Sequence, residues 1–464
     1  MGEQKIHFVT GRLAELALRE ILHPLAAEAG FEYTVQVMPI TVAALMSVDW
    51  ISKRIEVPAQ TDRVILPGYC RGDVAGLANK LGVPVEIGPK DVRRLPQFFG
   101  KQVTPPDLST YDIKIIAEIN HAPLKTIDEV VEMAKALAAD GADLIDIGGV
   151  PGTVSPNIAD YVRAVRDQGL RVSIDSLEVE EIAAAVRAGA ELVLSVNQSN
   201  REAAADWGCE VVVIPDEPSD LGSMRETMEL LGNRKVKFRV DPILEPIGLG
   251  FANSLGRYIE TRREFPECEM MMGIGNLTEL TDVDSAGVNF MLLGICQELG
   301  IRTVLTTQVI NWARSSVVEC DIARRMVAYA CRNRVPPKNL SEQLVVLRDS
   351  RLLNFSESQI EQLAEQIRDH NYRILANDGN LHLLGSGEQF SGTDPFAVFD
   401  ALAATEPDNL DASHAFYLGF EMCKAMIANQ LGKNYVQDEA LEWGHLTVEE
   451  KLRHRLSKKR KREI

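Results

Sequence analysis

The chain alternates short apolar runs with longer stretches in which apolar residues recur every three or four positions. The short runs have the length of buried strands, and the longer stretches have the period of amphipathic helices. Between about residues 112 and 330 eight such strand–helix units follow one another, with candidate strands KIIAEIN, DLIDIGG, RVSIDS, ELVLSVN, EVVVIPD, VKFRVDP, EMMMGIGN and RTVLTTQ. Eight βα units in roughly 220 residues predict a (β/α)8 barrel, also called a TIM barrel.

Two smaller segments flank the barrel, which is expected to occupy residues 111–330. Residues 1–110 also alternate strands and helices, in the order IHFVTG, YTVQVMP, RVILPG and VPVEIGP, and this order predicts a small Rossmann- or flavodoxin-like α/β domain. In residues 331–464 a hairpin signal at Asp378 and Gly379 precedes a long amphipathic stretch that ends at Gly432. This pattern predicts a C-terminal α+β domain.

Polar residues occur where the candidate barrel strands end. They are Asn120, Asp146, Asp175, Asn197, Asp241 and Asn276, from the first, second, third, fourth, sixth and seventh strands. One aspartate in such a place is as readily a helix cap as a functional residue. Several at successive strand ends indicate a binding site, because barrels of this kind carry their chemistry at the carboxyl ends of the strands.

The ligand follows from the hydrogen-bonding capacity of these side chains. Ionised aspartates accept hydrogen bonds and donate none, so a narrow mouth lined by them requires a ligand edge rich in N–H groups. A pterin offers such an edge, because its 2-amino group and N3–H form a planar pair of donors. A metal site is the alternative. His121 is the one histidine among these strand ends, so Mg²⁺ with Asn120 as a ligand is compatible with the rim and zinc is disfavoured.

Composition narrows the range of partners. The chain has 49 Lys and Arg residues against 67 Asp and Glu, and this formal net charge of −18 disfavours nucleic acid and anionic membranes as partners. No apolar run has the length of a membrane helix and the N-terminus does not read as a secretory signal, so a cytoplasmic location is expected. The seven cysteines include no CxxC pair, which argues against a disulfide framework. A homodimer remains open.

The order AEINHAP, GADLIDIGG, VSIDS and RVDPILEPIGLGF resembles dihydropteroate synthase and the wider family of pterin-binding barrels, over roughly residues 112–310. The three-part layout is similar to that of the dihydropteroate synthase-related proteins of the tetrahydromethanopterin-pathway type. The resemblance implies that Asp175 and Asp241 hold the pterin. It also implies that Asn120 matches the asparagine after the family's first strand and that Asp146 is the acidic residue of its second-strand motif.

The sequence departs from the synthases after the last two barrel strands. Their seventh strand is followed by a Ser-Arg-Lys motif, whereas GIGNLTE here puts Leu277 in the place of the lysine. Their Arg-x-His is replaced by TTQVINWARSS, in which Arg314 and Ser315 are candidate ligands of a phosphate on a second substrate. The stretch that contains Asn276 instead resembles pterin-dependent methyltransferases, in which an asparagine at this place contacts the pterin ring.

These expectations lead to one main hypothesis and two alternatives. The main hypothesis is a transferase that condenses a hydroxymethyl-dihydropterin diphosphate with an arylamine, in folate- or tetrahydromethanopterin-type cofactor biosynthesis. Its expected catalytic residues are Asn120, Asp175 and Asp241, and its expected pterin ligands are Asp146, Asp175, Asn197, Asp241 and Asn276. The alternatives are one-carbon or methyl transfer on a reduced pterin, and a pterin-binding subunit without catalysis of its own.

Overall fold

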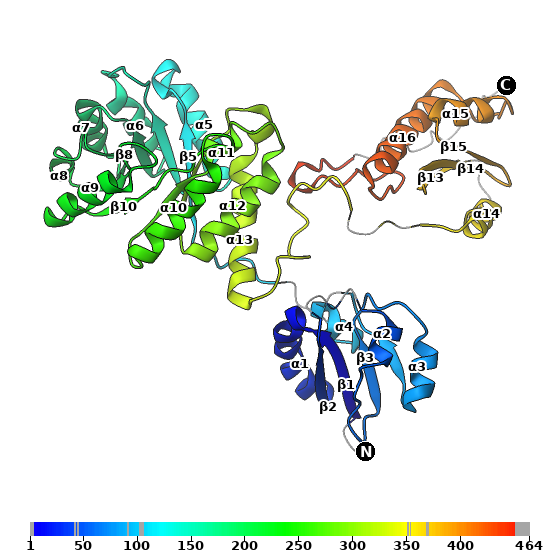
Figure 1. The fold of residues 1–464 in the computed structure, drawn as a ribbon. Coiled ribbons are helices and arrows are strands. Elements are labelled where there is room, and N and C mark those ends of the chain that lie inside the picture. The colour runs from blue at the N-terminus through cyan, green and yellow to red at the C-terminus, as the bar shows by residue number, and fades with distance from the viewer. Residues whose placement is uncertain are drawn as a thin grey trace, which may run out of the picture. The chain divides into compact units, whose positions relative to one another are not determined.

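A computed structural model of the chain describes residues 4–40, 43, 46–90, 92–101, 106–349, 352, 354–367 and 371–450. The chain divides into two compact units, Met1–Leu340 and Ser341–Ile464. Figure 1 shows the helices and strands in chain order from blue to red. No helix within the described ranges is long and apolar enough to cross a membrane.

Eight parallel strands form the barrel. They are β5 (Lys114–Ile119), β6 (Leu144–Gly148), β7 (Val172–Asp175), β8 (Leu192–Val196), β9 (Glu210–Val213), β10 (Phe238–Val240), β11 (Met271–Gly273) and β12 (Thr303–Thr306). They pair in the order β10-β9-β8-β7-β6-β5-β12-β11. A parallel bridge between Val240 and Met270 joins the two ends of this order, and the Val240 N–H donates to the Glu269 carbonyl at 2.9 Å. The predicted (β/α)8 barrel is confirmed.

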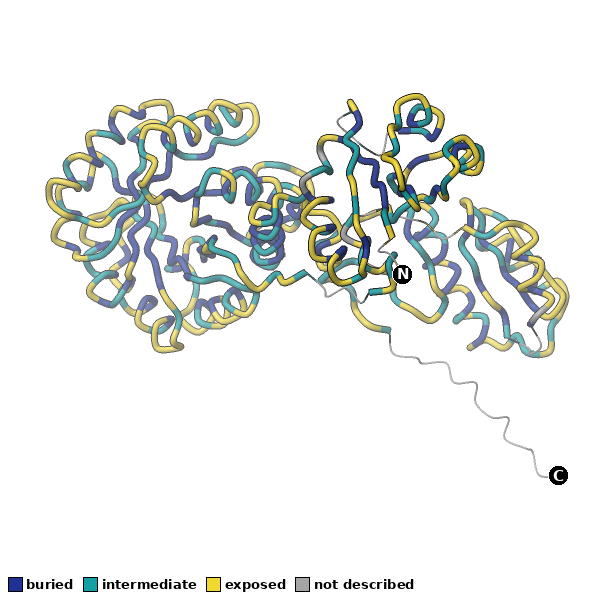
Figure 2. Tube along the Cα trace, turned by 90° about the horizontal axis from the view of Figure 1, so that it is seen from below, coloured by how far each residue is buried: buried dark blue, intermediate teal, exposed yellow. Residues whose placement is uncertain are grey.

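Helices follow the barrel strands and cover their outer face (Figure 1). They are α5 (Ile127–Ala139), α6 (Ile158–Arg166), α7 (Val179–Ala188), α8 (Ala204–Trp207), α9 (Leu221–Asn233), α10 (Phe251–Glu264), α11 (Gly275–Thr278), α12 (Ser285–Leu299) and α13 (Ser316–Asn333). Thr126 and Glu129 form a capping box at the start of α5, which satisfies two otherwise unpaired N–H groups. Figure 2 shows that the strands are buried and that the outward helix faces are exposed.

Side chains fill the barrel interior in layers. In the lowest layer, at the end where the strands begin, Arg239 pairs with Glu210 at 2.8 Å and donates to the Thr303 hydroxyl at 2.5 Å. Above it lies an apolar layer made by Ile116, Leu144, Leu192, Leu194, Val212 and Met271. Because side chains alternate between the two faces of a strand, the residues two positions after Ile116 and Leu144 also face inward, and they are the acids Glu118 and Asp146. The interior therefore changes from apolar to polar at the carboxyl ends of the strands.

The N-terminal segment is a four-stranded parallel sheet in the order β2-β1-β3-β4. Its strands are β1 (Gln4–Gly11), β2 (Phe31–Met38), β3 (Arg63–Leu66) and β4 (Val85–Ile87), and its helices are α1 (Glu15–Ala29), α2 (Val48–Ser52), α3 (Val74–Leu81) and α4 (Leu95–Phe98). One apolar cluster contains Val9, Val64 and Leu66, and another contains Ile6, Phe8 and Ile65. Alternate residues of the same strands thus feed two cores, as expected for a sheet covered on both faces.

The second unit is an α+β domain. It contains α14 (Glu357–Gln366), the antiparallel strands β13 (Arg373–Asn377), β14 (Asn380–Leu384) and β15 (Gln389–Gly392), and helices α15 (Pro395–Ala403) and α16 (Ala412–Leu431). The predicted hairpin turn has φ of 48° at Asp378 and 78° at Gly379, the left-handed pair that a two-residue turn requires. Before this domain, α13 continues to Asn333 and so passes the expected boundary at residue 331.

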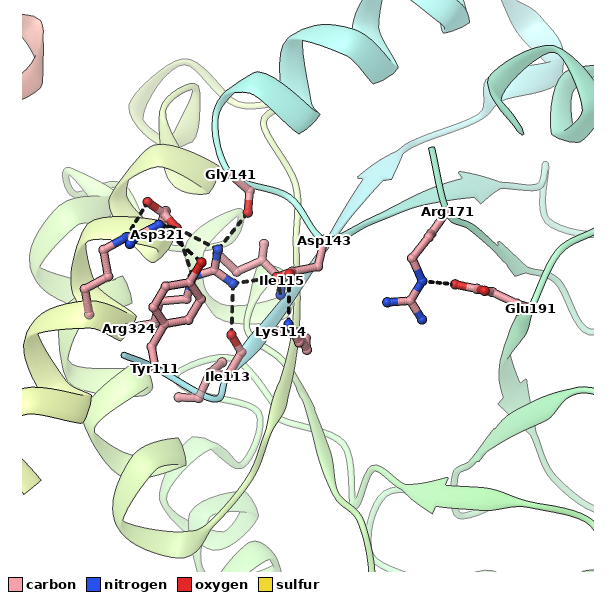
Figure 3. A network of polar contacts seen from close by, with 11 residues as sticks. Tyr111, Ile113, Lys114, Ile115, Gly141, Asp143, Arg171, Glu191, Asp321 and Arg324 are labelled. Atoms are coloured by element: carbon pink, nitrogen blue, oxygen red, sulfur yellow. Dashed lines mark hydrogen bonds and ion pairs between the residues drawn. The ribbon is translucent and has the colours of Figure 1, made fainter. Parts of the chain in front are cut away.

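A buried arginine ties the last barrel helix to the first two strands (Figure 3). Arg324 of α13 is 2% exposed, donates to the carbonyls of Ile113 at 2.9 Å and Gly141 at 3.0 Å, and pairs with Asp321 and Asp143 at 2.6 and 2.5 Å. Because the Asp143 carboxylate also accepts from the Ile115 N–H of β5 at 2.9 Å, this network fixes the end of the barrel at which the strands begin.

We expect Arg324→Met to lower the free energy of unfolding by about 3 kcal/mol, because it removes the buried cation of Asp143 and Asp321 and the donor to the Ile113 and Gly141 carbonyls. Arg171→Met is the matched control. The Arg171–Glu191 pair in the same view has side chains 56% and 43% exposed, and its loss should cost less than about 1 kcal/mol. Urea unfolding of both variants measures the difference, and equal losses would contradict a special role for Arg324.

Candidate functional site

Three carboxylates meet at the carboxyl end of the barrel. Glu118 of β5 stands in register with Asp146 of β6, and Asp175 of β7 stands in register with Gly148. Carboxylate oxygens from the three acids lie within 4.8 Å of one another. A Cβ atom at Gly148 would lie 2.6 Å from a Glu118 oxygen. The absence of a side chain at Gly148 therefore makes room for the Glu118 carboxylate.

Burial raises the pKa of all three acids, and repulsion between carboxylates adds to the rise at Glu118 and Asp146. Burial raises the pKa of Glu118 to about 8, with further contributions from the charges of Asp175 and Glu279. Burial and the neighbouring carboxylates raise the pKa of Asp146 well above its usual range, and burial raises that of Asp175. None of the three forms an ion pair with a described Lys or Arg residue. The cluster therefore favours a proton, a cation or a ligand rich in N–H groups.

The first strand also brings Asn120 to this rim. Its Oδ1 and the Oδ2 of fully buried Asp146 have no hydrogen-bond partner among the described residues. Lys125 donates from Nζ to the Asn120 carbonyl at 2.9 Å. Mg²⁺ prefers oxygen ligands, including those of amides and carboxylates. The residues present thus fit the Mg²⁺ expected at Asn120.

Asp241 lies just after β10 and is held by three donors. Its Oδ1 accepts from the Tyr258 hydroxyl and from the Ile243 N–H at 2.8 Å, and its Oδ2 accepts from the Gly273 N–H at 3.1 Å. Burial raises the pKa of Asp241 to about 6, although these hydrogen bonds oppose the rise. Since each carboxylate oxygen has two lone pairs, Oδ2 can still accept from a ligand.

Asn276 lies in the same part of the rim. Its exposed side chain donates from Nδ2 to the Leu244 carbonyl at 3.1 Å. A Cβ atom at Gly273 would lie 3.5 Å from the Asn276 Nδ2 and 3.6 Å from the Asp241 Oδ2. The Asn276 amide and the Asp241 carboxylate therefore both approach one point beside Gly273, where the lack of a side chain leaves space between them.

Asn197 does not take part in the same way. Its Oδ1 accepts from the Ser199 N–H at 2.9 Å and from the Ser199 hydroxyl at 2.7 Å, so this oxygen closes the turn after β8. The residue of β8 that reaches Asp175 is Ser195, whose hydroxyl donates to Oδ1 at 3.0 Å. Ser195 has φ of 72° beside an irregularity in the strand register. The irregularity turns the serine toward the rim.

Ser315 and Arg314 precede α13, where a phosphate was expected. The Ser315 hydroxyl donates to Glu319 at 2.8 Å. The buried Glu319 carboxylate also accepts from the Ser285 hydroxyl at 2.6 Å and the Asn289 amide at 2.8 Å. An internal carboxylate thus already engages the hydroxyl predicted to bind phosphate. Arg314 is exposed and stays a predicted phosphate ligand.

Sequence reasoning missed Glu118, Ser195 and Tyr258 as residues of this site. Glu118 had a visible signal, because it is the one acid inside the apolar run KIIAEIN and lies two positions before Asn120. In a strand that spacing places both side chains on one face. Ser195 interrupts LVLSVN in a similar way. Tyr258 lies mid-helix in α10, and no local pattern marks it as a partner of Asp241.

The acidic residues lie at the carboxyl ends of the barrel strands. In (β/α)8 barrels this is the end that carries the binding or catalytic site. Residues 119–229 match the model of the family described as pterin binding enzyme, so this part of the barrel is similar to the pterin-binding enzymes. Residues 4–90 match a family of unknown function (DUF6513). The matched pterin-binding segment includes Asn120, Asp146 and Asp175.

Similar proteins include an uncharacterized protein of Methanocaldococcus jannaschii, 29% identical over 368 residues, which are 71% of this chain and 69% of the relative. Similar solved structures include Yersinia pestis dihydropteroate synthase with a pterine-sulfa conjugate, at 21% identity and a TM-score of 0.39, covering 49% of this chain and 95% of that one. The Xanthomonas albilineans synthase with 4-aminobenzoic acid has the same identity, coverage and TM-score.

The structure shows that the Leu277 side chain is buried. This side chain is 4% exposed and belongs to the apolar core between strands and helices. Its neighbour Asn276 is the exposed residue at the rim. The Leu277 side chain therefore points away from the rim, because consecutive residues of the short helix α11 point in different directions.

We expect Leu277→Lys to lower the free energy of unfolding by about 3 kcal/mol or more, because it removes a buried apolar side chain and forces an ammonium group toward the core. Asn276→Lys is the matched control and should unfold within about 1 kcal/mol of the unmodified protein, since its side chain is exposed. Thermal unfolding checks both, and a stable Leu277→Lys protein would show that the core is not as described.

Proposed function

We propose that the barrel binds a pterin between Asp175 and Asp241 and acts as a transferase of the dihydropteroate synthase type. The observation that carries this proposal is the half-buried carboxylate of Asp175 and the buried carboxylate of Asp241 at one rim, each with acceptor capacity that the protein leaves free. The 2-amino and N3–H donors of a pterin satisfy such an acceptor in the manner of a guanidinium group. The pterin-binding family match over residues 119–229 supports the same ligand.

The proposed reaction condenses a hydroxymethyl-dihydropterin diphosphate with an arylamine, in folate- or tetrahydromethanopterin-type cofactor biosynthesis. The amine nitrogen forms a bond to the exocyclic carbon of the pterin, the carbon–oxygen bond to pyrophosphate breaks, and the nitrogen releases a proton to water. Asn120 and the neighbouring carboxylates would hold Mg²⁺, which supplies positive charge for the pyrophosphate. The Lys125 ammonium, bound to the Asn120 carbonyl, adds a second cation to this loop.

One-carbon or methyl transfer on a reduced pterin is the second candidate. The observation that favours it is the acidic rim, where Glu118, Asp146 and Asp175 lie together and form no ion pair with a Lys or Arg of the described part of the chain. The negative charges of such a rim repel a diphosphate group, whereas they do not repel an uncharged substituent of the pterin. A subunit that binds pterin without turnover would use the same contacts.

Pyrophosphate release separates these functions. The full chain is mixed with dihydropterin diphosphate, Mg²⁺ and a panel of arylamines, and pyrophosphate and the pterin product are measured. Release that requires both substrates supports condensation. Binding of the pterin without release, together with demethylation of a methylated reduced pterin in the presence of a thiol acceptor, would move the assignment to methyl transfer.

We expect Asp241→Asn to weaken pterin binding by roughly 2 to 4 kcal/mol, because an acceptor oxygen is replaced by a donor that faces the donors of the ligand. Asp282→Asn is the control, since Asp282 is an exposed residue of the barrel outside the carboxylate cluster. Titration calorimetry with a dihydropterin compares the three proteins. Equal affinity of Asp241→Asn and the unmodified protein would remove Asp241 from the pterin site.

The affinity should also depend on pH. Because burial raises the pKa of Asp241 to about 6, the carboxylate that accepts from the ligand is present above this pH and is lost by protonation below it. The difference in affinity between the unmodified protein and Asp241→Asn is therefore expected to be full near neutral pH and to close as the pH falls through about 6. A difference that does not change with pH would contradict an ionised Asp241 in the complex.

A further inference from the structure

The loop after β10, from Asp241 to Glu245, holds an unusual backbone conformation. Ile243 has φ of 64°, in the left-handed region that β-branched residues rarely adopt. In this conformation the Ile243 N–H donates to the Asp241 carboxylate at 2.8 Å. The next carbonyl, that of Leu244, accepts from Asn276 at 3.1 Å. The strained residue thus lies between the two side chains that meet at Gly273.

One arginine of α10 binds this loop at three points. Arg257 donates from Nε to the Pro242 carbonyl at 3.2 Å and from Nη2 to the Ile243 carbonyl at 2.9 Å. Its Nη2 also pairs with Glu245 at 2.8 Å, with side chains 11% and 21% exposed. The rigid fork of a guanidinium suits several acceptors at fixed spacing. Arg257 therefore binds the carbonyl before Ile243 and the carbonyl of Ile243 itself.

The same face of α10 completes the support. Tyr258, the next residue, donates its hydroxyl to Asp241, and the Ser254 hydroxyl accepts from the Glu245 N–H at 3.2 Å. A Cβ atom at Gly250 would lie 2.4 Å from a Glu245 oxygen, so this glycine leaves space for the carboxylate that pairs with Arg257. These contacts hold the loop from its first residue to its last.

We propose that Arg257 is a positioning residue of the pterin site, which holds Ile243 in its strained conformation and thereby fixes Asp241 and Asn276 for the ligand. The inference rests on the proposed pterin binding. Without the arginine, Ile243 relaxes to a common φ, its N–H turns away from Asp241, and the Leu244 carbonyl leaves Asn276. A strained conformation persists only where surrounding contacts determine it, and Arg257 supplies three of them.

The test uses the full chain and a rescue. Arg257→Met is expected to weaken dihydropterin binding at least about tenfold, the factor that corresponds to about 1.4 kcal/mol. Ile243→Gly in the Arg257→Met background is expected to recover most of the loss, because glycine adopts positive φ without strain. Arg263→Met is the matched control, since Arg263 is an exposed arginine of the same helix, and it should bind like the unmodified protein.

A ligand-free measurement keeps this inference separate from the proposed function. Amide hydrogen exchange at Ile243 should be slow in the unmodified protein, fast in Arg257→Met and slow again in the protein with both substitutions. If the exchange follows this pattern and no variant binds pterin, the proposed function fails and the loop support stands. If Arg257→Met does not fold, Arg257→Lys carries the same comparison, because an ammonium cannot bridge three acceptors.

Two outcomes would overturn the proposal. The first is an Arg257→Met protein that binds dihydropterin as tightly as the Arg263→Met control. The second is a loss of binding that Ile243→Gly does not reduce, with unchanged exchange at residue 243. This second result would mean that Arg257 affects the ligand through its charge and not through the backbone of Ile243.

Discussion

Closure of the parallel sheet is the constraint on which the rest of the barrel depends. The ends of the strand order meet through the bridge between Val240 and Met270, and β5 pairs with β6 on one side and with β12 on the other. A closed parallel sheet brings all its carboxyl ends to one ring. Glu118, Asp146 and Asp241 therefore share a rim although they are distant in sequence. The Arg324 network secures the opposite end of the same barrel.

Repulsion within the rim then defines what the site can accept. Neighbouring carboxylates in a place of low water access raise one another's pKa values, as at Glu118. Hydroxyl groups of Ser173 and Ser195 satisfy one oxygen each of Asp146 and Asp175, which leaves acceptor capacity toward the opening. The site is complementary to a cation or to a planar N–H-rich edge, and both belong to the chemistry proposed for the barrel.

Sequence patterns predicted the architecture better than the site. Barrel strands are buried on both faces, so they appear as nearly continuous apolar runs whose ends are marked by residues such as Asn120 and Asp175. The direction of a side chain after a strand depends on the local turn, and the repeat of apolar residues along the sequence does not predict that turn. Asn197 closes its own turn with Ser199, and Leu277 faces the core while Asn276 faces the rim. Such details depend on register, bulges and short helices.

The lowest layer of the barrel determines from which end molecules can reach the carboxylates. Arg239, Glu210 and Thr303 fill the interior at one end, and the apolar layer of Ile116 and Met271 lies above them. These two layers close the barrel interior at the end where the strands begin, so the barrel is not an open channel. A molecule that reaches the carboxylates of Glu118 and Asp146 must therefore approach them from the carboxyl ends of the strands.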